Sequence, residues 1–73
     1  MWERELVRRK AILASNIKKL RLEKGIAQEK LALEAGVDRT LVSKIEREIG
    51  NPSLEILVKL AITLRVKVSD LLE

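Results

Sequence analysis

Apolar side chains recur along this chain at helical spacing, and the first such stretch occupies residues 3–23. Four of them lie seven, four and three residues apart, which places them on one face of a helix: Leu6, Leu13, Ile17 and Leu20. Gly25 follows this stretch, and glycine at such a position typically ends a helix. We therefore predict one amphipathic helix over residues 3–23.

A second helix is predicted over residues 28–35 and a third over residues 38–47. Gly36 can end the second helix in a left-handed conformation, and Asp38 is a favoured residue at the start of the third. The positions that face inward are apolar in both helices: Leu31, Ala32, Ala35, Val42 and Ile45.

A fourth helix is predicted over residues 53–64, with Ser53 as its N-cap. It carries a series of apolar side chains: Leu54, Leu57, Val58, Ala61 and Leu64. A last turn or short helix covers about residues 68–72, because the alternation of Val66 and Val68 is too short and too isolated for a strand. The pattern predicts a compact all-α domain of four to five helices.

Residues 28–47 have the organisation of a helix-turn-helix motif, in which two short helices meet across the turn at 36–38. Ala32 is small where the second helix must cross closely, and Gly36 can adopt the left-handed backbone that the turn requires. Val37 fills the space beneath the turn. The alternative that these residues leave open is a purely structural pair of helices in a small bundle.

Composition narrows the classes of function. The formal net charge of +4 suits nucleic acid, but it also suits acidic partners or solubility alone. Trp2 is the only aromatic residue, which argues against proteins that stack single-stranded bases on aromatic side chains. The chain has no Cys, no His and no acidic cluster, so we expect no enzyme, metal site or cofactor. No apolar run reaches the roughly 20 residues that span a membrane, and we expect a soluble, cytoplasmic protein.

Several short strings of residues between about 12 and 72 resemble the lambda-repressor/Cro-like helix-turn-helix proteins, also called the XRE family. The string VDRT at 37–40, with Ser43 and the IER of 45–47, is especially similar to controller proteins of restriction–modification systems. The wider resemblance is carried by IKKLR at 17–21, EKG at 23–25, QEKLA at 28–32, NPSL at 51–54 and LA at 60–61.

The resemblance implies that the second helix of the motif, the reading helix, enters the major groove and reads bases through one face: Arg39, Thr40, Ser43 and Lys44. It implies phosphate contacts from a second group: Gln28, Arg21, Asn51 and Ser53. It also implies an ion pair between Arg21 and Glu46 that holds the reading helix. From the residues alone, these positions are equally compatible with solvated charges, caps and turn residues.

Three positions depart from the pattern of the family. Glu48 and Arg65 occupy places where relatives usually have glycine. If the backbone stays left-handed there, each costs about 1 kcal/mol. Alternatively, Gly50 takes over the turn and the loop 48–51 is reshaped. Ala27 replaces the usual Ser or Thr cap of the first motif helix, which loses roughly 1 kcal/mol.

The chain divides into two regions. Residues 1–11 form a basic N-terminal extension, expected to be helical, ahead of the helix-turn-helix domain at 12–73.

A single reading helix covers few base pairs, so we expect a homodimer. Its predicted interface is Ile49, Leu54 and Val68, whereas Val66 and Leu71 are expected in the core.

The function these features predict is a transcription regulator that binds double-stranded DNA as a dimer on a palindromic operator and controls a restriction–modification operon. RNA polymerase is a further candidate partner, through the acidic side chains Glu29 and Glu34 of the first motif helix. The alternative is a protein-interaction module, such as an antitoxin-like or adaptor domain.

Overall fold

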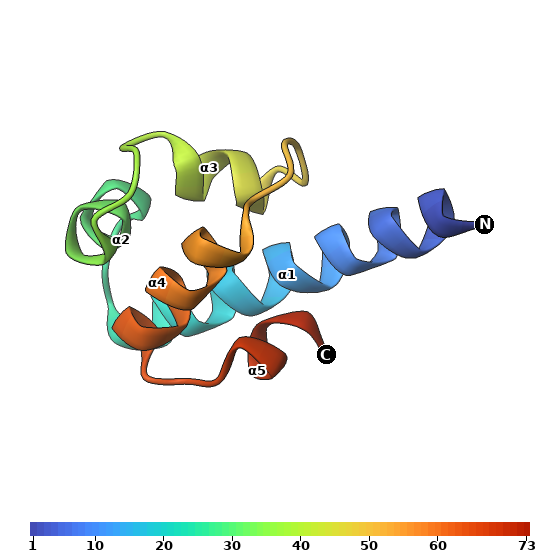
Figure 1. Cartoon of the computed structure of the whole chain (residues 1–73). Helices are drawn as coiled ribbons and strands as arrows, with labels where there is room; N and C mark the ends of the chain where they lie inside the picture. Colours follow the sequence, from blue (N-terminus) through green and yellow to red (C-terminus); the bar gives the residue numbers. More distant parts are fainter.

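The computed structural model describes all residues from Met1 to Glu73. Five α-helices follow one another and no strand is present, so the predicted all-α fold is confirmed (Figure 1). The helices are α1 (Trp2–Lys24), α2 (Gln28–Ala35), α3 (Leu41–Glu46), α4 (Leu54–Leu64) and α5 (Val68–Leu72). None of them is both long enough and apolar enough to cross a membrane.

The long helix α1 is the element against which the others are arranged. It ends at Gly25, whose left-handed backbone (φ 73°) lets its N–H bond back to the carbonyls of the last turn. Residues 1–11 belong to the same helix from Trp2 onward, and its first turns project beyond the body of the molecule (Figure 1). The extension is thus continuous with the domain rather than separated from it by a linker.

The C-terminal helix α5 is bound to the middle of α1 by polar side chains. Arg9 donates from Nη1 to the carbonyl of Leu72 at 2.7 Å, and Asn16 donates from Nδ2 to the carbonyl of Leu71 at 3.0 Å. Leu71 is fully buried, while Val66 and Val68 are half-buried and pack against the core. These contacts hold the end of the chain against the helix that begins it.

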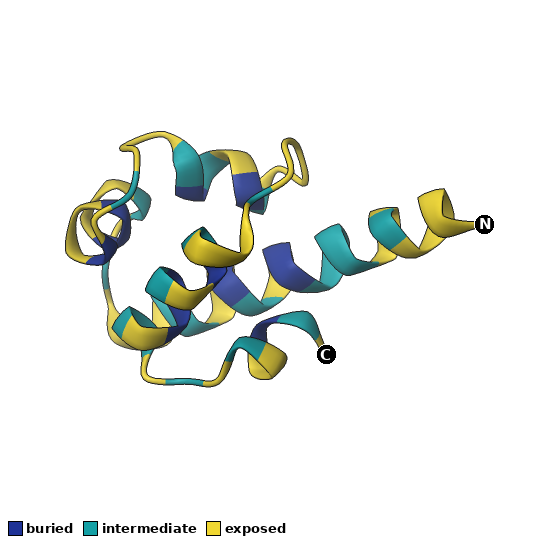
Figure 2. Ribbon diagram, in the orientation of Figure 1, coloured by how far each residue is buried: buried dark blue, intermediate teal, exposed yellow.

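The core lies where α1, α2, α3 and α4 meet, and every helix contributes at least one buried side chain (Figure 2). The predicted inward positions of the motif are all buried: Leu31, Ala32, Ala35, Val42 and Ile45. α1 packs against α3 and α5, and α2 packs against α3 and α4. The two motif helices are therefore supported from behind by α1 and α4.

The third helix is shorter than predicted, because it begins at Leu41 instead of Asp38. Asp38 acts before the helix: its carboxylate accepts the N–H of Thr40, and its carbonyl accepts the N–H of Leu41 at 3.0 Å. This side-chain bond favours a turn over helix. The prediction of a helix starting at Asp38 is thus wrong, while Ser53 caps α4 as predicted by accepting the N–H of Ile56.

The backbone is left-handed at both positions where this chain lacks the usual glycine of the family. Glu48 has φ 63° and Arg65 has φ 60°, and Gly50 is left-handed as well, at φ 81°. The loop after α3 therefore keeps the left-handed turn at Glu48 and adds a second one at Gly50. Ala27 precedes α2 without a side-chain cap, as its lack of a polar atom requires.

Replacing the left-handed arginine that ends α4 should stabilise the fold. We expect Arg65→Gly to raise the free energy of unfolding by about 0.5–1 kcal/mol, since glycine relieves the steric strain but adds entropy to the unfolded chain. Urea denaturation followed by circular dichroism measures this change. The control Arg65→Ala removes the same charge but keeps a Cβ, and it should give no gain; equal gains from both variants would contradict the argument.

Candidate nucleic-acid interface

The reading helix α3 is anchored on one side and open on the other. Val42 and Ile45 are buried in the core, so the residues between and before them face outward. Arg39, Thr40 and Lys44 are exposed, while Ser43 is half-buried. The structure therefore brings three of the four predicted base-reading residues onto one exposed edge and leaves Ser43 closer to the body.

The turn before α3 is held by backbone bonds that glycine makes possible. Gly36 is left-handed (φ 69°), and its N–H reaches the carbonyl of Leu33 at 3.2 Å. The N–H of Val37 reaches the carbonyl of Ala32 at 3.0 Å, and its side chain packs against the core. These bonds fix the angle between α2 and α3, which sets how α3 is presented.

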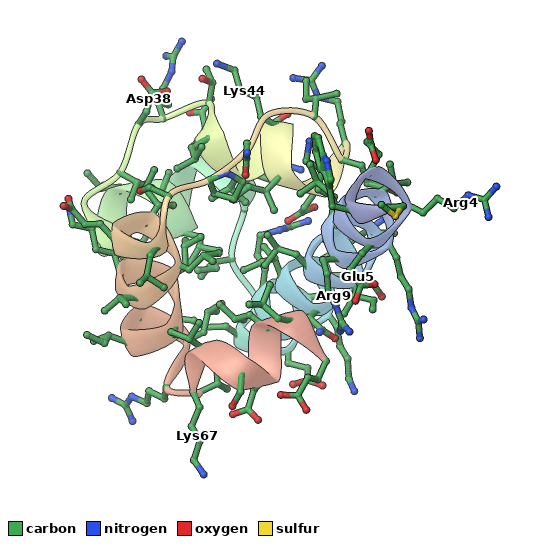
Figure 3. The ribbon with its side chains drawn as sticks, turned by 45° about the vertical axis from the view of Figure 1, so that its right-hand side comes forward. Arg4, Glu5, Arg9, Asp38, Lys44 and Lys67 are labelled. Atoms are coloured by element: carbon green, nitrogen blue, oxygen red, sulfur yellow. The ribbon has the colours of Figure 1, made fainter.

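Asp38 forms a compact hydrogen-bonded unit with Thr40 at the start of α3. Its Oδ1 atom accepts the Thr40 hydroxyl at 2.7 Å and the Thr40 backbone N–H at 2.8 Å. These two bonds lower the pKa of Asp38, and the charges of Lys44 and Arg39 lower it further. In Figure 3, Asp38 and Lys44 lie at the same edge of the molecule, with Lys67 at the opposite edge.

Three cations lie in or beside α3: Arg39 before it, Lys44 within it and Arg47 directly after it. Arg39, Lys44 and Arg47 take part in none of the six ion pairs within the chain. Their charges are therefore available to an external partner. Arg47 donates only to the carbonyl of Ser43, at 3.4 Å, which leaves most of its guanidinium free. Exposed cations without an ion-pair partner are typical of a phosphate-binding surface.

Arg21 and Glu46 form an ion pair between α1 and α3. The contact is bidentate, with Nε to Oε2 at 2.8 Å and Nη2 to Oε1 at 3.1 Å. Only 11% of the Arg21 side chain and 6% of the Glu46 side chain are exposed. The hydrogen bond to Glu46 raises the pKa of Arg21 against the opposing effect of burial. The pair is thus largely removed from water.

Two further bonds extend this pair to the start of α2. Arg21 donates from Nη1 to the carbonyl of Ile26 at 2.8 Å, and Gln28 donates from Nε2 to Oε1 of Glu46 at 3.0 Å. Gln28 therefore has a structural partner, and only its second amide hydrogen is available to a phosphate. Arg21 uses three of the five N–H donors of a guanidinium in the same way. No pattern in the sequence predicted the contact between Gln28 and Glu46.

The two remaining predicted phosphate ligands lie between α3 and α4. Asn51 is exposed, and Ser53 is exposed while its Oγ caps α4 through the N–H of Ile56 at 3.2 Å. A capping hydroxyl accepts this bond, so its hydrogen can still be donated outward. Both residues therefore have a free donor on the side of the chain that precedes α4.

An apolar stripe runs along the exposed side of α4. Leu54, Val58 and Ile62 are spaced four residues apart and are 70%, 39% and 72% exposed. Ile49 is also exposed, whereas Val68 is half-buried against the core and offers less free surface. Of the predicted interface residues, Leu54 thus belongs to a larger surface. Val58 and Ile62 were not among the predicted interface residues, although they lie four and eight residues after Leu54 on the same helical face.

Residues 17–71 match the helix-turn-helix family. A hypothetical transcription factor of Neisseria meningitidis serogroup B is 43% identical over 86% of this chain and 59% of that protein. Its crystal structure superimposes with a TM-score of 0.86 and 42% identity, over 89% of this chain and 75% of that one. The control protein C.BamHI of Bacillus amyloliquefaciens is 38% identical over 85% of this chain and 78% of that protein.

The crystal structure of the restriction-modification controller protein C.AhdI of Aeromonas hydrophila is also similar. It has a TM-score of 0.80 and 35% identity over 85% of this chain and 94% of that one. Other relatives are longer: the match spans 59% of the Neisseria factor and 57% of the regulator SinR of Bacillus subtilis. The chain thus spans less than two thirds of the length of these curated relatives.

Breaking the ion pair should destabilise the fold far more than breaking a surface pair. We expect Glu46→Ala to lower the free energy of unfolding by about 3 kcal/mol, because Arg21 is left buried and unpaired. The control Glu55→Ala removes the exposed pair with Lys59, whose atoms lie 3.1 Å apart, and should cost less than about 1 kcal/mol.

The double variant Arg21→Met with Glu46→Leu separates the pair from the packing around it. It removes both charges, so it should recover most of the stability that Glu46→Ala loses. Chemical denaturation measures all three variants. Equal small losses for Glu46→Ala and Glu55→Ala would show that the pair between α1 and α3 is not a structural support.

Proposed function

Because this chain belongs to the helix-turn-helix family, in its lambda-repressor/Cro-like (XRE) branch, we propose that it is a transcription regulator that binds double-stranded DNA. The observation that carries this proposal is the exposed edge of α3. Arg39, Thr40 and Lys44 project there without ion-pair partners, while the opposite face of the helix is buried. A helix held in this way can enter the major groove with its N-terminal side chains against the base edges.

The four side chains proposed to read bases, at the start of α3 and within it, have chemistry suited to this role. Arg39 can form two parallel hydrogen bonds with O6 and N7 of guanine, a contact worth roughly 1–3 kcal/mol of discrimination. Thr40 can bond a base edge or press its methyl group on thymine. Ser43 and Lys44 lie about one helical turn further along. Lys44 is the more exposed of the two, and its longer side chain can reach further into the groove.

Phosphate contacts would set the register of α3 on the duplex. Gln28 stands at the start of α2, where free backbone N–H groups favour an anion. Asn51 and Ser53 offer donors at the start of α4, and Arg21 retains two N–H donors beyond its structural bonds. These residues contribute positioning and affinity, whereas base preference comes from α3.

We further propose that two copies of the chain bind a palindromic operator. The apolar stripe of Leu54, Val58 and Ile62 is the surface that supports this, because side chains so exposed rarely lie in a row without a partner. A two-fold axis beside α4 would pair the stripe with itself and place Ile49 at its margin. Val68 would contribute only its exposed part.

The regulated genes are proposed from resemblance. C.AhdI is named as a restriction-modification controller protein and C.BamHI as a control protein, and this chain has the string VDRT at 37–40 ahead of Ser43. A restriction–modification operon is therefore the target we propose. RNA polymerase is a further candidate partner through α2, where Glu29 is exposed and Glu34 already faces Lys24 and Lys30 at 3.9 Å.

A protein-interaction module remains the competing function. Leu33 of α2 is exposed beside Val37 and Arg39, around a shallow hollow. A protein partner seated there would cover the start of α3 and exclude DNA. Absence of duplex binding at about 50 mM salt would favour this alternative, because electrostatic binding is strong at that ionic strength.

Duplex binding and base reading can be tested together by selecting bound sequences from random DNA. We expect wild-type protein to select a site with two inverted halves, and log K to fall by about 0.9 per log unit of salt for each phosphate contacted. Arg39→Ala should relax the preference at one position of each half. The control Lys67→Ala removes a cation at the opposite edge and should leave the selected site unchanged (Figure 3).

The dimer can be tested through the apolar stripe. We expect Ile62→Asp to raise the dimer dissociation constant by more than about tenfold. Each of the two copies would then bury one unpaired aspartate charge in the interface. Sedimentation equilibrium measures it. The control Leu22→Asp adds the same charge at an exposed leucine of α1 (58% exposed) and should leave association unchanged. Equal effects of both variants would place the interface elsewhere.

A further inference from the structure

One hydrogen on the reading edge is already committed within the chain. The hydroxyl of Thr40 lies 2.7 Å from Oδ1 of Asp38, and the same oxygen accepts the backbone N–H of Thr40 at 2.8 Å. Both side chains are exposed at the start of α3. The Thr40 hydroxyl is therefore not a free rotor, and its orientation is set before any DNA arrives.

The direction of this bond follows from the state of the carboxylate. The Thr40 bonds and the nearby cations lower the pKa of Asp38, so its carboxylate is ionised at neutral pH. An ionised carboxylate has no hydrogen to donate and can only accept. The hydrogen of the Thr40 hydroxyl must then point at Asp38, and the two lone pairs of Oγ1 point away from it.

Resting on the proposed function, we infer that Asp38 determines the base preference at the position that Thr40 reads. With its hydrogen committed, the Thr40 hydroxyl can only accept a bond from the DNA. In the major groove, adenine and cytosine present an amino donor, whereas guanine presents only the acceptors O6 and N7 and thymine only O4. The pair thus selects adenine or cytosine at one position of each half-site.

The second carboxylate oxygen of Asp38 strengthens this selection. Oδ2 has no hydrogen-bond partner within the chain, so two acceptors, Oδ2 and Thr40 Oγ1, stand close together. Their partial charges repel the acceptor edges of guanine and thymine. A threonine without such a neighbour can rotate its hydroxyl to suit a donor or an acceptor and discriminates little. Asp38 is therefore a positioning residue that acts through Thr40.

The experiment compares base preferences by selection from random duplex DNA, followed by affinities for the four bases at the affected position. Wild-type protein should prefer adenine or cytosine there by about tenfold. Asp38→Asn keeps the shape, and its amide oxygen can still accept both bonds from Thr40, but its NH2 group puts a donor in place of the free acceptor Oδ2. This variant should accept all four bases at that position and keep every other preference.

Two further variants separate reading from folding and from charge. Thr40→Val keeps the branched shape but removes the acceptor, and it should lose the same preference. Asp38→Ala removes the acceptor that holds the Thr40 hydroxyl, so the preference should broaden at the one position. Both Asp38 variants remove a negative charge, so both should bind every duplex more tightly. Circular dichroism confirms that each variant folds, and Asp38→Asn carries the test if the alanine variant does not.

The outcomes distinguish this inference from the proposed function. A uniform change in affinity with an unchanged preference in Asp38→Asn and Asp38→Ala would overturn the inference, because Asp38 would then act only through charge or the turn. Equal wild-type affinities for the four bases at that position of one strand would overturn it as well, because each exchange of adenine for thymine or cytosine for guanine moves the amino donor to the other strand. Failure of the wild-type protein to bind duplex would overturn the proposed function itself.

Discussion

The guanidinium of Arg21 links three parts of this small domain from the inside. It pairs with Glu46 near the end of α3, bonds the carbonyl of Ile26 before α2, and is carried by α1. Gln28 joins the same carboxylate from the first turn of α2. Both charges are almost fully removed from water. Removing one of them would therefore leave the other buried without a partner, which lowers the stability of the fold. The position of α3 relative to α1 and α2 is consequently tightly constrained.

This constraint matters because α3 is too short to be stable by its own bonds. It has six residues, and isolated helices of that length do not persist in water. Its shape depends on Val42 and Ile45 in the core and on the ion pair at Glu46. All three lie on the inner side, so the exposed side chains of Arg39 and Lys44 do not support the fold.

The fourth helix has two separate apolar faces. Leu57, Leu60 and Ala61 are buried in the core, whereas Leu54, Val58 and Ile62 stay exposed beside them. A short domain without Cys can bury only a small core, and association is a common way to bury more apolar surface. The stripe begins at Leu54, directly after the Asn51 to Ser53 segment that we assign to phosphate contacts. In the proposed function, association and DNA contact would therefore meet at the start of the same helix.

Helical spacing and caps were sufficient to predict four helices and a last turn or short helix, the turn at Gly36 and the buried positions of the motif. These are local properties: the period of 3.6 residues, the side chain of Ser53 and the freedom of glycine act within a few residues. The same locality explains the error at Asp38. The carboxylate of an aspartate can cap a helix or close a turn by accepting the N–H two residues further on. In this chain it accepts the N–H of Thr40, so a turn forms and α3 begins later.

Other features depend on residues that are far apart along the chain. The meeting of Arg21, Gln28 and Glu46, and the binding of the carbonyls of α5 by Arg9 and Asn16, follow from how the helices pack, and spacing does not reveal them. The left-handed backbone at Glu48 and Arg65 is similar, since local preference disfavours it. Which apolar face of α4 is covered is likewise settled by the neighbouring helices. Burial is a property of the assembled molecule, so a sequence pattern can predict an apolar face without showing what covers it.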